Sequence, residues 1–337
     1  MTFIKRVVAT FLAAVSLFFS VITNLGKNDG KENFRVTSYI IASRITDESR
    51  LNFEDFDIIT DVILFGCATF DEKGEVKIEK GVLEKALSNL QRVIENRDVK
   101  IHLNFLGPSP AEKTGNYEKD MAEQGKLHSF AFKSGVLENN IVSVLEEYDF
   151  DGVFFDYEYP LNYINWTPFN QFLVRLDKKI GKRILGLAVS EWDIKLSPGS
   201  FMAVDRFEVM LYDVYDEDGR HAAPEKVKEL SKNLKRYSIP KEKLDFGLPF
   251  YSRPSDRSEY WYDYVGYCDR IDKNGYYFDS SLEKSFWFNR PADIEETTCF
   301  ALENGFGGVM IWHYSCDFPS GDSRSLLGAV GRALKST

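Results

Sequence analysis

Two carboxylates separated by one residue form the part of this sequence best suited to chemistry. Asp156 and Glu158 lie in the segment DGVFFDYEYP, residues 151–160. Because strand side chains alternate between two faces, Phe154, Asp156 and Glu158 share one face if this segment is a strand. Like charge and apolar surroundings would raise the pKa of one carboxyl group. A neutral carboxyl beside an ionised one can catalyse cleavage of an acetal, whereas a strand end that only exposes its acids to solvent has no such role.

The elements that would position this pair alternate between strands and helices. Runs rich in β-branched and aromatic residues predict eight strands: Arg35–Ala42, Ile58–Ala68, Val99–Leu106, Phe150–Tyr157, Arg183–Val189, Phe207–Tyr212, Leu244–Phe250 and Gly308–His313. Amphipathic stretches predict helices: Val82–Ile94, Phe130–Glu147, Phe169–Ile180, Pro224–Tyr237, Ala292–Asn304 and Ser323–Leu334. This alternation indicates an α/β fold of the (β/α)8 TIM barrel type, whose catalytic side chains lie at the carboxyl ends of the strands.

The hydrophobicity of the strands supports a sheet that is covered on both faces. The run Val62–Phe65 is apolar at every position, as in parallel strands that pack between helices. An open, doubly wound sheet is the competing fold, but no Gly-x-Gly-x-x-Gly follows the first strand. We therefore predict a single barrel domain over residues 34–337.

The charge balance excludes one class of partner. The 337 residues carry 42 Lys and Arg against 52 Asp and Glu, a net charge of −10. A nucleic-acid-binding protein needs a basic face to displace phosphate counterions, so no nucleic-acid partner is predicted. The hydrophobic fraction of 44 % suffices for a large core.

Neither the histidines nor the cysteines form a metal-binding pattern. The four histidines are scattered, and the sequence contains neither HExxH nor Cys-x-x-Cys; no metal and no cofactor is therefore predicted. Cys67, Cys268, Cys299 and Cys316 could pair in an exported protein or remain isolated thiols. The sequence leaves both alternatives open.

Residues 1–25 have the features of an export signal. Lys5 and Arg6 precede the apolar run Val7–Ile22, in the order of a signal peptide. The run is close to the shortest membrane-spanning helix, so an uncleaved anchor is the alternative to the cleaved signal peptide that we favour. Residues 26–33 form a polar linker. We expect a secreted protein, with membrane contact only through this N-terminal segment.

Segments on successive predicted strands resemble glycoside hydrolase family 18, the chitinases and endo-β-N-acetylglucosaminidases. Residues 151–158 resemble the family signature Asp-Gly-x-Asp-x-Asp-x-Glu. Further similarities follow in family order: Ser38-Tyr39 on the first strand, Met210-Leu211-Tyr212-Asp213 on the sixth, Phe246–Arg253 on the seventh and Gly307–Trp312 on the eighth. One short motif would be weak evidence, but this ordered set spans most of residues 36–320.

The resemblance implies a retaining, substrate-assisted mechanism, which makes this family an exception to hydrolysis by two enzyme carboxylates. Glu158, at the acid position, would protonate the glycosidic oxygen and later deprotonate the incoming water. The 2-acetamido oxygen of the substrate would attack the anomeric carbon. Asp156 would hold the acetamide N–H and stabilise the oxazolinium intermediate.

The resemblance also implies a sugar site around this acid pair. Tyr212 would hydrogen-bond the acetamide carbonyl, with Asp213 supporting it. Trp312 would form the apolar floor under the distorted sugar, and Tyr39 and Met210 would line the same pocket. The implied partner is an oligosaccharide or polysaccharide that contains N-acetylglucosamine.

The sequence departs from the family pattern at three places. Phe154 stands where the family has an acid that contacts the middle aspartate, so reduced activity or a displaced pH optimum is expected. Leu106-Gly107 replaces the usual Gly-Gly after the third strand, and Ser252 replaces a glycine after Tyr251. Because the acid Glu158 is retained, we favour an enzyme over a chitinase-like lectin, which stays the alternative.

The α+β insertion that many chitinases carry between strands seven and eight is reduced or absent. Only about forty residues separate Arg253 from the helix predicted at Ala292, and they are rich in tyrosine. These aromatic residues either pack on the barrel or stack on sugar beside a shallower groove. A shallow groove suits short or branched substrates, so an endo-β-N-acetylglucosaminidase acting on glycoprotein or cell-wall glycans is a further alternative to a chitinase.

Overall fold

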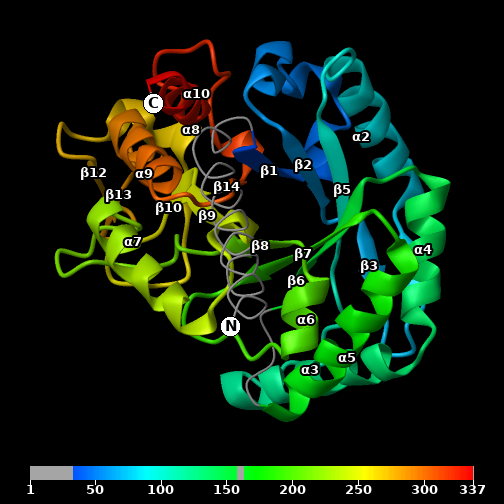
Figure 1. The fold of residues 1–337 in the computed structure, drawn as a ribbon. Coiled ribbons are helices and arrows are strands. Elements are labelled where there is room, and N and C mark those ends of the chain that lie inside the picture. Colours follow the sequence, from blue (N-terminus) through cyan, green and yellow to red (C-terminus); the bar gives the residue numbers. More distant parts are fainter. Residues whose placement is uncertain (1–32, 158–162, 337) are drawn as a thin grey trace, which may run out of the picture. The chain divides into compact units, whose positions relative to one another are not determined.

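The computed structural model describes residues 33–157 and 163–336, and it contains a closed barrel of eight parallel strands (Figure 1). The predicted leader and most of the predicted linker lie outside the described residues, as does Glu158. The barrel strands are β1 Arg35–Ile41, β2 Asp61–Phe65, β5 Lys100–Phe105, β6 Gly152–Asp156, β7 Ile184–Val189, β8 Arg206–Val209, β9 Leu244–Pro249 and β14 Gly308–Trp312. Each falls within or beside a predicted strand, and the barrel closes where β1 pairs with β14. The predicted (β/α)8 fold is confirmed.

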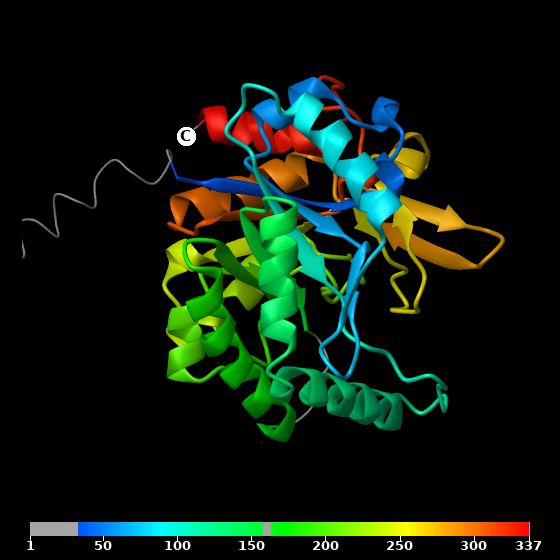
Figure 2. The same ribbon diagram turned by 90° about the vertical axis from the view of Figure 1, so that its right-hand side faces the viewer.

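Helices surround the barrel in both views (Figures 1 and 2). They are α2 Lys80–Val93, α3 Tyr117–Lys133, α4 Leu137–Glu147, α5 Tyr163–Ile180, α6 Pro198–Ala203, α7 Pro224–Ser231, α8 Tyr264–Tyr267, α9 Pro291–Glu303 and α10 Leu326–Ser336. In α2 the buried positions Leu83, Ala86, Leu87 and Leu90 form one face, which is the spacing that predicted this helix.

The helix predictions differ from the structure in several places, three of which follow. The single helix predicted over 130–147 is two helices, because Gly135 adopts a left-handed conformation with φ of 71° and turns the chain between α3 and α4. The helix predicted over 224–237 is α-helical only to Ser231 and continues as a 3-10 helix, Lys232–Tyr237. The six-residue α6 was not predicted.

The connection from β1 to β2 contains 3-10 helices in place of an α-helix. These short elements are Ala42–Ile45, Glu48–Arg50 and Phe53–Asp57. They cover the outer side of β1 less completely than a full helix would, and a cavity lies there that is described below.

Ion pairs fill the amino-terminal end of the barrel. The Arg35 guanidinium donates to the fully buried Asp245 at 2.5 Å. Asp61 accepts from Arg206 at 2.5 Å and lies 2.9 Å from His102 Nε2. Burial opposes the charge of Asp61, but its bonds to His102 and Arg206 lower its pKa. This charged layer closes the barrel at the end opposite the predicted site.

The loops at the carboxyl end of the barrel contain three small two-stranded sheets. They pair β3 Ala68–Phe70 with β4 Val76–Ile78, β10 Tyr251–Ser252 with β11 Tyr262–Asp263, and β12 Tyr276–Asp279 with β13 Lys284–Trp287. The last two sheets and α8 occupy the region between β9 and β14, where a reduced insertion was predicted.

The aromatic residues of this region divide between the two predicted alternatives. The Tyr262 ring stacks on Tyr267 with centroids 4.0 Å apart and lies 4.6 Å from Phe286, so these rings pack on one another. Tyr260 and Trp261, by contrast, are 45 % and 42 % exposed. Tyr260 and Trp261 are therefore available to contact a ligand, unlike the stacked rings.

The four cysteines are free thiols, which decides between the two cysteine alternatives. Within the described part of the chain, no group of His, Cys, Asp and Glu side chains could hold a metal ion. The same residues contain no helix with the length and hydrophobicity needed to cross a bilayer.

Candidate active site

The described site residues lie at the carboxyl rim of the barrel, although they come from distant parts of the sequence. Asp156 is the last residue of β6, and Trp312 is the last residue of β14. Tyr39 lies near the end of β1, and Met210 begins the Met210–Asp213 segment that directly follows β8. Because parallel barrel strands all end on the same side, four strands bring these residues to one rim. Glu158 follows Asp156 by two residues and lies outside the described residues.

Three aromatic rings form an apolar cluster at this rim. The Trp312 ring meets Tyr39 edge-to-face at a centroid distance of 5.4 Å and Phe65 at 5.0 Å. Tyr39 is buried, whereas Trp312 keeps part of its surface exposed. The geometry holds the indole in place by edge-to-face contacts and leaves it accessible to a ligand. The role of Phe65, at the end of β2, was not predicted.

A chain of ring contacts links this cluster to Tyr212. Trp312 is followed by His313, whose ring lies 6.0 Å from Trp261. Trp261 lies 5.7 Å from Tyr251, and Tyr251 lies 6.1 Å from Tyr212. The rim is therefore aromatic from β14 to β8. Trp261 belongs to the loop whose aromatic residues were predicted either to pack on the barrel or to stack on sugar, but its contacts with Tyr251 and His313 were not predicted.

Tyr212 is held at the rim by a close approach to a glycine. A Cβ atom at Gly247 would lie 2.6 Å from the Tyr212 ring, closer than van der Waals contact permits. Gly247 of β9 thus provides the space that the ring occupies, and Tyr212 is only 8 % exposed. The glycine in the Phe246–Arg253 segment has a packing role at the site.

Three side chains fix the carboxylate of Asp213. The Tyr251 hydroxyl donates to Asp213 Oδ1 at 2.5 Å, His221 Nε2 lies 3.2 Å away, and Arg253 Nε forms an ion pair at 2.9 Å. Burial opposes ionisation of Asp213, but the bonds from His221 and Tyr251 outweigh it and lower its pKa. Asp213 is thus anionic near neutral pH. His221 is an isolated histidine in a loop, and no local pattern could have assigned it.

Replacing Tyr251 by phenylalanine is expected to destabilise the fold by about 1 kcal/mol at pH 7, since one hydrogen bond to a partly exposed carboxylate is lost. The lowered pKa of Asp213 means that this stabilisation is present above the unfolded pKa and disappears as pH falls through the folded one. Urea unfolding at pH 7 and at pH 3 measures both effects. Tyr260→Phe, at a half-exposed ring, is the control and should change neither value; a loss for Tyr251→Phe that is larger at pH 3 than at pH 7 would contradict the assignment.

Phe154 fills the barrel interior directly below Asp156. Its ring is fully buried and lies 5.0 Å from the His102 ring. A Cβ atom at Gly186, its register partner on β7, would lie 2.0 Å from the Phe154 ring, so the glycine makes room for it. A packed aromatic ring therefore occupies the position where the resemblance implied an acid.

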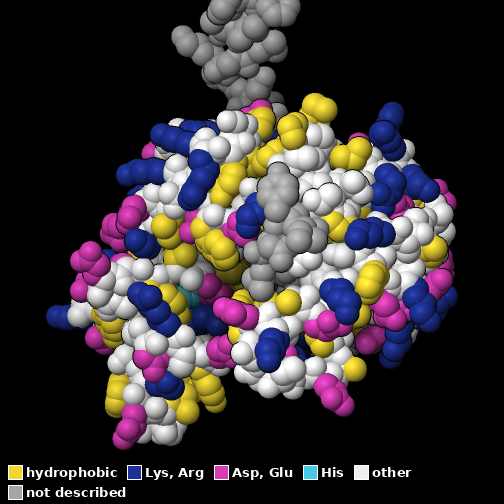
Figure 3. All heavy atoms as spheres, turned by 90° about the horizontal axis from the view of Figure 1, so that it is seen from below, with side chains coloured by type: hydrophobic (Ala, Val, Ile, Leu, Met, Phe, Trp, Pro, Cys, Tyr) yellow, Lys and Arg dark blue, Asp and Glu magenta, His cyan; other side chains and the backbone are white. Residues whose placement is uncertain are grey.

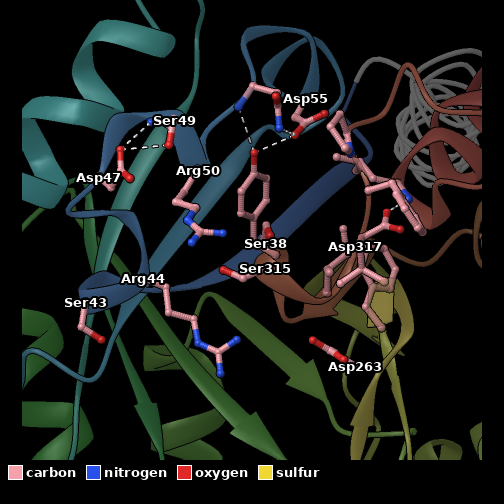
Figure 4. A pocket seen from close by; sticks show the side chains of 18 of the residues that line it. Ser38, Ser43, Arg44, Asp47, Ser49, Arg50, Asp55, Asp263, Ser315 and Asp317 are labelled. Carbon is pink, nitrogen blue, oxygen red and sulfur yellow. Dashed lines mark hydrogen bonds between the residues drawn. The ribbon is translucent and has the colours of Figure 1, made fainter. Parts of the chain in front are cut away.

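A polar cavity of about 720 Å³ lies outside the barrel, between the 3-10 helices after β1 and the loop after β14. Arg44 and Arg50 extend into it, and Asp263 lies across from Arg44 (Figure 4).

His313, which follows Trp312, is close to this region. Burial lowers the pKa of His313 to about 4, and Arg44 adds to this effect. Since Ile311 of β14 lines the cavity and directly precedes Trp312, the cavity lies beside the strand that carries Trp312. Its mixture of guanidinium, carboxylate and hydroxyl groups suits a hydroxyl-rich ligand.

Asp317 forms the wall of this cavity and also caps α10. Its carboxylate accepts from the backbone N–H groups of Leu326 and Leu327 and from the Ser325 hydroxyl. Burial nevertheless raises the pKa of Asp317 to about 6, because desolvation of the carboxylate exceeds the effect of these bonds.

The raised pKa of Asp317 predicts a stability change with pH. Between the unfolded value near 4 and about 6 the folded state binds the extra proton, so stability falls as pH rises through this window. Relative to Asp317→Asn, which does not titrate, the wild type should lose about 2 kcal/mol between pH 4 and pH 7. Urea unfolding of both proteins at the two pH values measures this difference. Parallel pH profiles would show that the carboxyl titrates normally.

Residues 35–317 match the family described as "Glycosyl hydrolases family 18". No curated protein matches the sequence. The face drawn in Figure 3 carries acidic, basic and hydrophobic side chains.

Solved structures share the fold at low sequence identity. The chitinase ChiB of Flavobacterium johnsoniae aligns with a TM-score of 0.68 and 20 % identity, covering 90 % of this chain and 94 % of that one. A plant class V chitinase mutant from Cycas revoluta, in complex with (GlcNAc)3, has a TM-score of 0.69 and 16 % identity over 89 % and 99 % of the two chains. The chitinase-like agglutinin of Robinia pseudoacacia has a TM-score of 0.67 and 17 % identity over 88 % and 99 %.

Proposed function

The chain belongs to glycosyl hydrolase family 18, and we propose that it hydrolyses β-1,4 linkages of glycans containing N-acetylglucosamine, such as chitin or chitooligosaccharides. One observation supports the proposal: Asp156, Tyr39 and Trp312 lie at or near the carboxyl ends of β6, β1 and β14, and Tyr212 follows β8, so four strands carry these groups to the same barrel rim. They supply a carboxylate, phenol groups and an indole face, the groups that an acetamido sugar can bind.

In the first step, Glu158 protonates the glycosidic oxygen while the acetamido oxygen attacks the anomeric carbon. The leaving sugar departs with the proton, and a cyclic oxazolinium ion remains. The Asp156 carboxylate accepts a hydrogen bond from the acetamide N–H and stabilises the positive charge. The Tyr212 hydroxyl donates to the acetamide oxygen, and Asp213, fixed by Tyr251 and His221, adds negative potential nearby.

In the second step, Glu158 accepts a proton from water, which attacks the anomeric carbon from the side that the leaving group vacated. The bond from the anomeric carbon to the acetamido oxygen breaks, which restores the acetamido group. The configuration is retained, because two inversions occur at the same carbon. Trp312 supports the sugar ring on its accessible indole face. Met210 directly follows β8 and lines the same pocket.

A chitinase-like binding protein without turnover is the second candidate. Phe154 favours it, because the packed ring denies Asp156 the acidic neighbour typical of the family. The Robinia agglutinin shows that this fold is also found in a lectin-type protein. An endo-β-N-acetylglucosaminidase is the third candidate, favoured by the short region between β9 and β14.

A product assay tests the proposal and separates the candidates. The full chain is incubated with chitooligosaccharides, chitin, peptidoglycan and a high-mannose glycoprotein, and products are identified by mass spectrometry. The proposal requires chitooligosaccharide cleavage with an initial β-anomer in the NMR spectrum. Binding without products indicates the lectin candidate, and release of intact glycans from the glycoprotein alone indicates the endoglycosidase.

We further propose that the protein acts after export, because two basic residues, Lys5 and Arg6, precede an apolar run in the order of a signal peptide.

A further inference from the structure

A second pocket lies between α7 and α9, away from the aromatic rim. It has a volume of about 560 Å³. Its floor is apolar and consists of Leu234, Ile239, Leu244, Phe300 and Phe306. Four ammonium groups surround it: those of Lys228, Lys232, Lys235 and Lys241. Helices α7 and α9 are in contact along this pocket and lie side by side at the left of Figure 1.

Two of the four lysines already have a polar partner within the protein. Lys228 pairs with Glu296 at 2.5 Å, and Lys241 donates to the Asn304 carbonyl at 2.8 Å. Lys232 and Lys235 are exposed, and among the described residues neither forms an ion pair. These two charges are available to a ligand.

The ammonium groups also line the apolar floor directly. Lys228 Nζ lies 5.6 Å from the centroid of the Phe300 ring, and Lys241 Nζ lies 5.0 Å from that of Phe306. A ligand that contacts these two lysines therefore also contacts the rings of Phe300 and Phe306. The pocket combines positive charge with hydrophobic contact, which suits an anion that carries an apolar portion.

This local charge opposes the charge of the whole chain. Between Lys226 and Lys243 the sequence contains seven basic residues and only two glutamates, Glu229 and Glu242, whereas the net charge of the chain is −10. Glu229 is paired with Lys226. An acidic protein that concentrates lysines around one pocket has a local preference for anions that its net charge does not predict.

The pocket belongs to the amino-terminal end of the barrel. Leu244 is the first residue of β9, and the Gly307 N–H donates to the carbonyls of Lys241 and Leu244. The Arg35 N–H in turn donates to the Gly307 carbonyl at 2.9 Å. The first residue of β1 thus adjoins the pocket wall, and the aromatic rim lies at the opposite, carboxyl ends of the barrel strands.

We propose that this pocket is a binding site for anionic phospholipid at a membrane surface. Lys232 and Lys235 bind the headgroup phosphate, and the glycerol and upper acyl chain contact Phe300 and Phe306. A free inorganic phosphate would leave the apolar floor in water, and a neutral lipid would leave the lysines unused. Binding in this orientation keeps the rim with Asp156 and Trp312 directed away from the membrane and open to glycan.

Vesicle co-flotation of the full chain tests the proposal. Vesicles of phosphatidylcholine alone are compared with vesicles that contain about 30 % phosphatidylglycerol. Because each lysine near an anionic surface contributes a few-fold in affinity, Lys232→Glu combined with Lys235→Glu should weaken binding to anionic vesicles by at least about tenfold. Binding to neutral vesicles should be unchanged, since every variant retains the same N-terminal segment.

Lys73→Glu combined with Lys77→Glu is the matched control. Both residues are exposed on the β3–β4 sheet at the opposite end of the barrel and change the net charge equally. Equal loss of binding in the two double variants would overturn the proposal in favour of a general charge effect. Polyphosphate or inorganic phosphate that binds the wild type as well as anionic vesicles do would overturn it in favour of a soluble anion site. Hydrolysis of a soluble chitooligosaccharide should be the same in all variants, so this test is independent of the proposed function.

Discussion

Replacing Glu158 by glutamine is expected to lower kcat for chitooligosaccharide hydrolysis by roughly 10²–10⁴-fold, the contribution of a positioned general acid and base. Glutamine preserves the size of the side chain but cannot protonate the leaving oxygen or accept a proton from water. Because the acetamido group, Tyr212 and Trp312 still bind the sugar, the affinity for the oligosaccharide should change little. Initial rates with a fluorogenic chitooligosaccharide and calorimetric binding to the unmodified sugar measure the two quantities.

The controls for this experiment follow from the chemistry. Glu84→Gln, at an exposed position of α2, makes the same change away from the rim and should be neutral. Asp156→Asn should also reduce kcat, because the oxazolinium ion loses its counter-charge. Unchanged hydrolysis in Glu158→Gln, with active wild type as reference, would remove Glu158 from the mechanism. An inactive wild type that still binds the sugar would instead indicate the lectin candidate.

Truncating Phe154 to alanine is expected to cost about 3–5 kcal/mol of unfolding free energy, the range for aromatic side chains removed from a core. The ring is fully buried in the barrel, and its neighbour on β7 is Gly186, which has no side chain to fill the space. Urea unfolding measures the change. Phe53→Ala, at a half-exposed ring, should stay within about 0.5 kcal/mol.

The packing of Phe154 against Gly186 adds a second, sharper test. Gly186→Ala alone should be strongly destabilising, since its Cβ would lie 2.0 Å from the Phe154 ring. In a Phe154→Ala background the same substitution should cost far less, which a double-mutant cycle detects as coupling. Additive effects would show that the two positions do not share this space.

Introducing the family acid as Phe154→Asp is expected to be at least as damaging as alanine. The smaller aspartate side chain would leave part of the space of the ring empty. Its carboxyl group would also be buried in the barrel interior, which costs free energy unless it finds hydrogen-bond partners. We expect lower stability without recovery of activity. A stable Phe154→Asp protein with increased kcat would show that the barrel accommodates an acid at this position, and that Phe154 alone limits the reaction.

The barrel was predictable because its signals are local. Strands such as Arg35–Ile41 and Gly152–Asp156 are apolar runs of ordinary strand length, and α2 carries its buried residues at helical spacing. The break at Gly135 was missed because the run over 130–147 is amphipathic on both sides of it. Local periodicity does not distinguish one helix from two that a left-handed glycine separates.

The chemistry-bearing residues were predictable for a related reason. Asp156, Tyr212, Asp213 and Trp312 lie in short segments at strand ends, so the sequence specifies their residue types and their order along the chain. That these four lie at one rim follows from parallel strands ending on one side. Glu158 follows Asp156 by two residues in the sequence. The sequence by itself therefore determined the fold class, the family and the identity of the candidate groups.

The surroundings of those groups were decided only by the tertiary structure. His221 on Asp213, Phe65 on Trp312 and Gly186 under Phe154 are contacts between residues far apart in the chain. The same holds for the lysine-rimmed pocket, which needs α7 beside α9. The periodicity of hydrophobic residues along the sequence does not predict such contacts, because they depend on barrel register and loop geometry. Sequence alone thus specified which groups could act, and the closed barrel specified what fixes each group and which other surfaces the fold exposes.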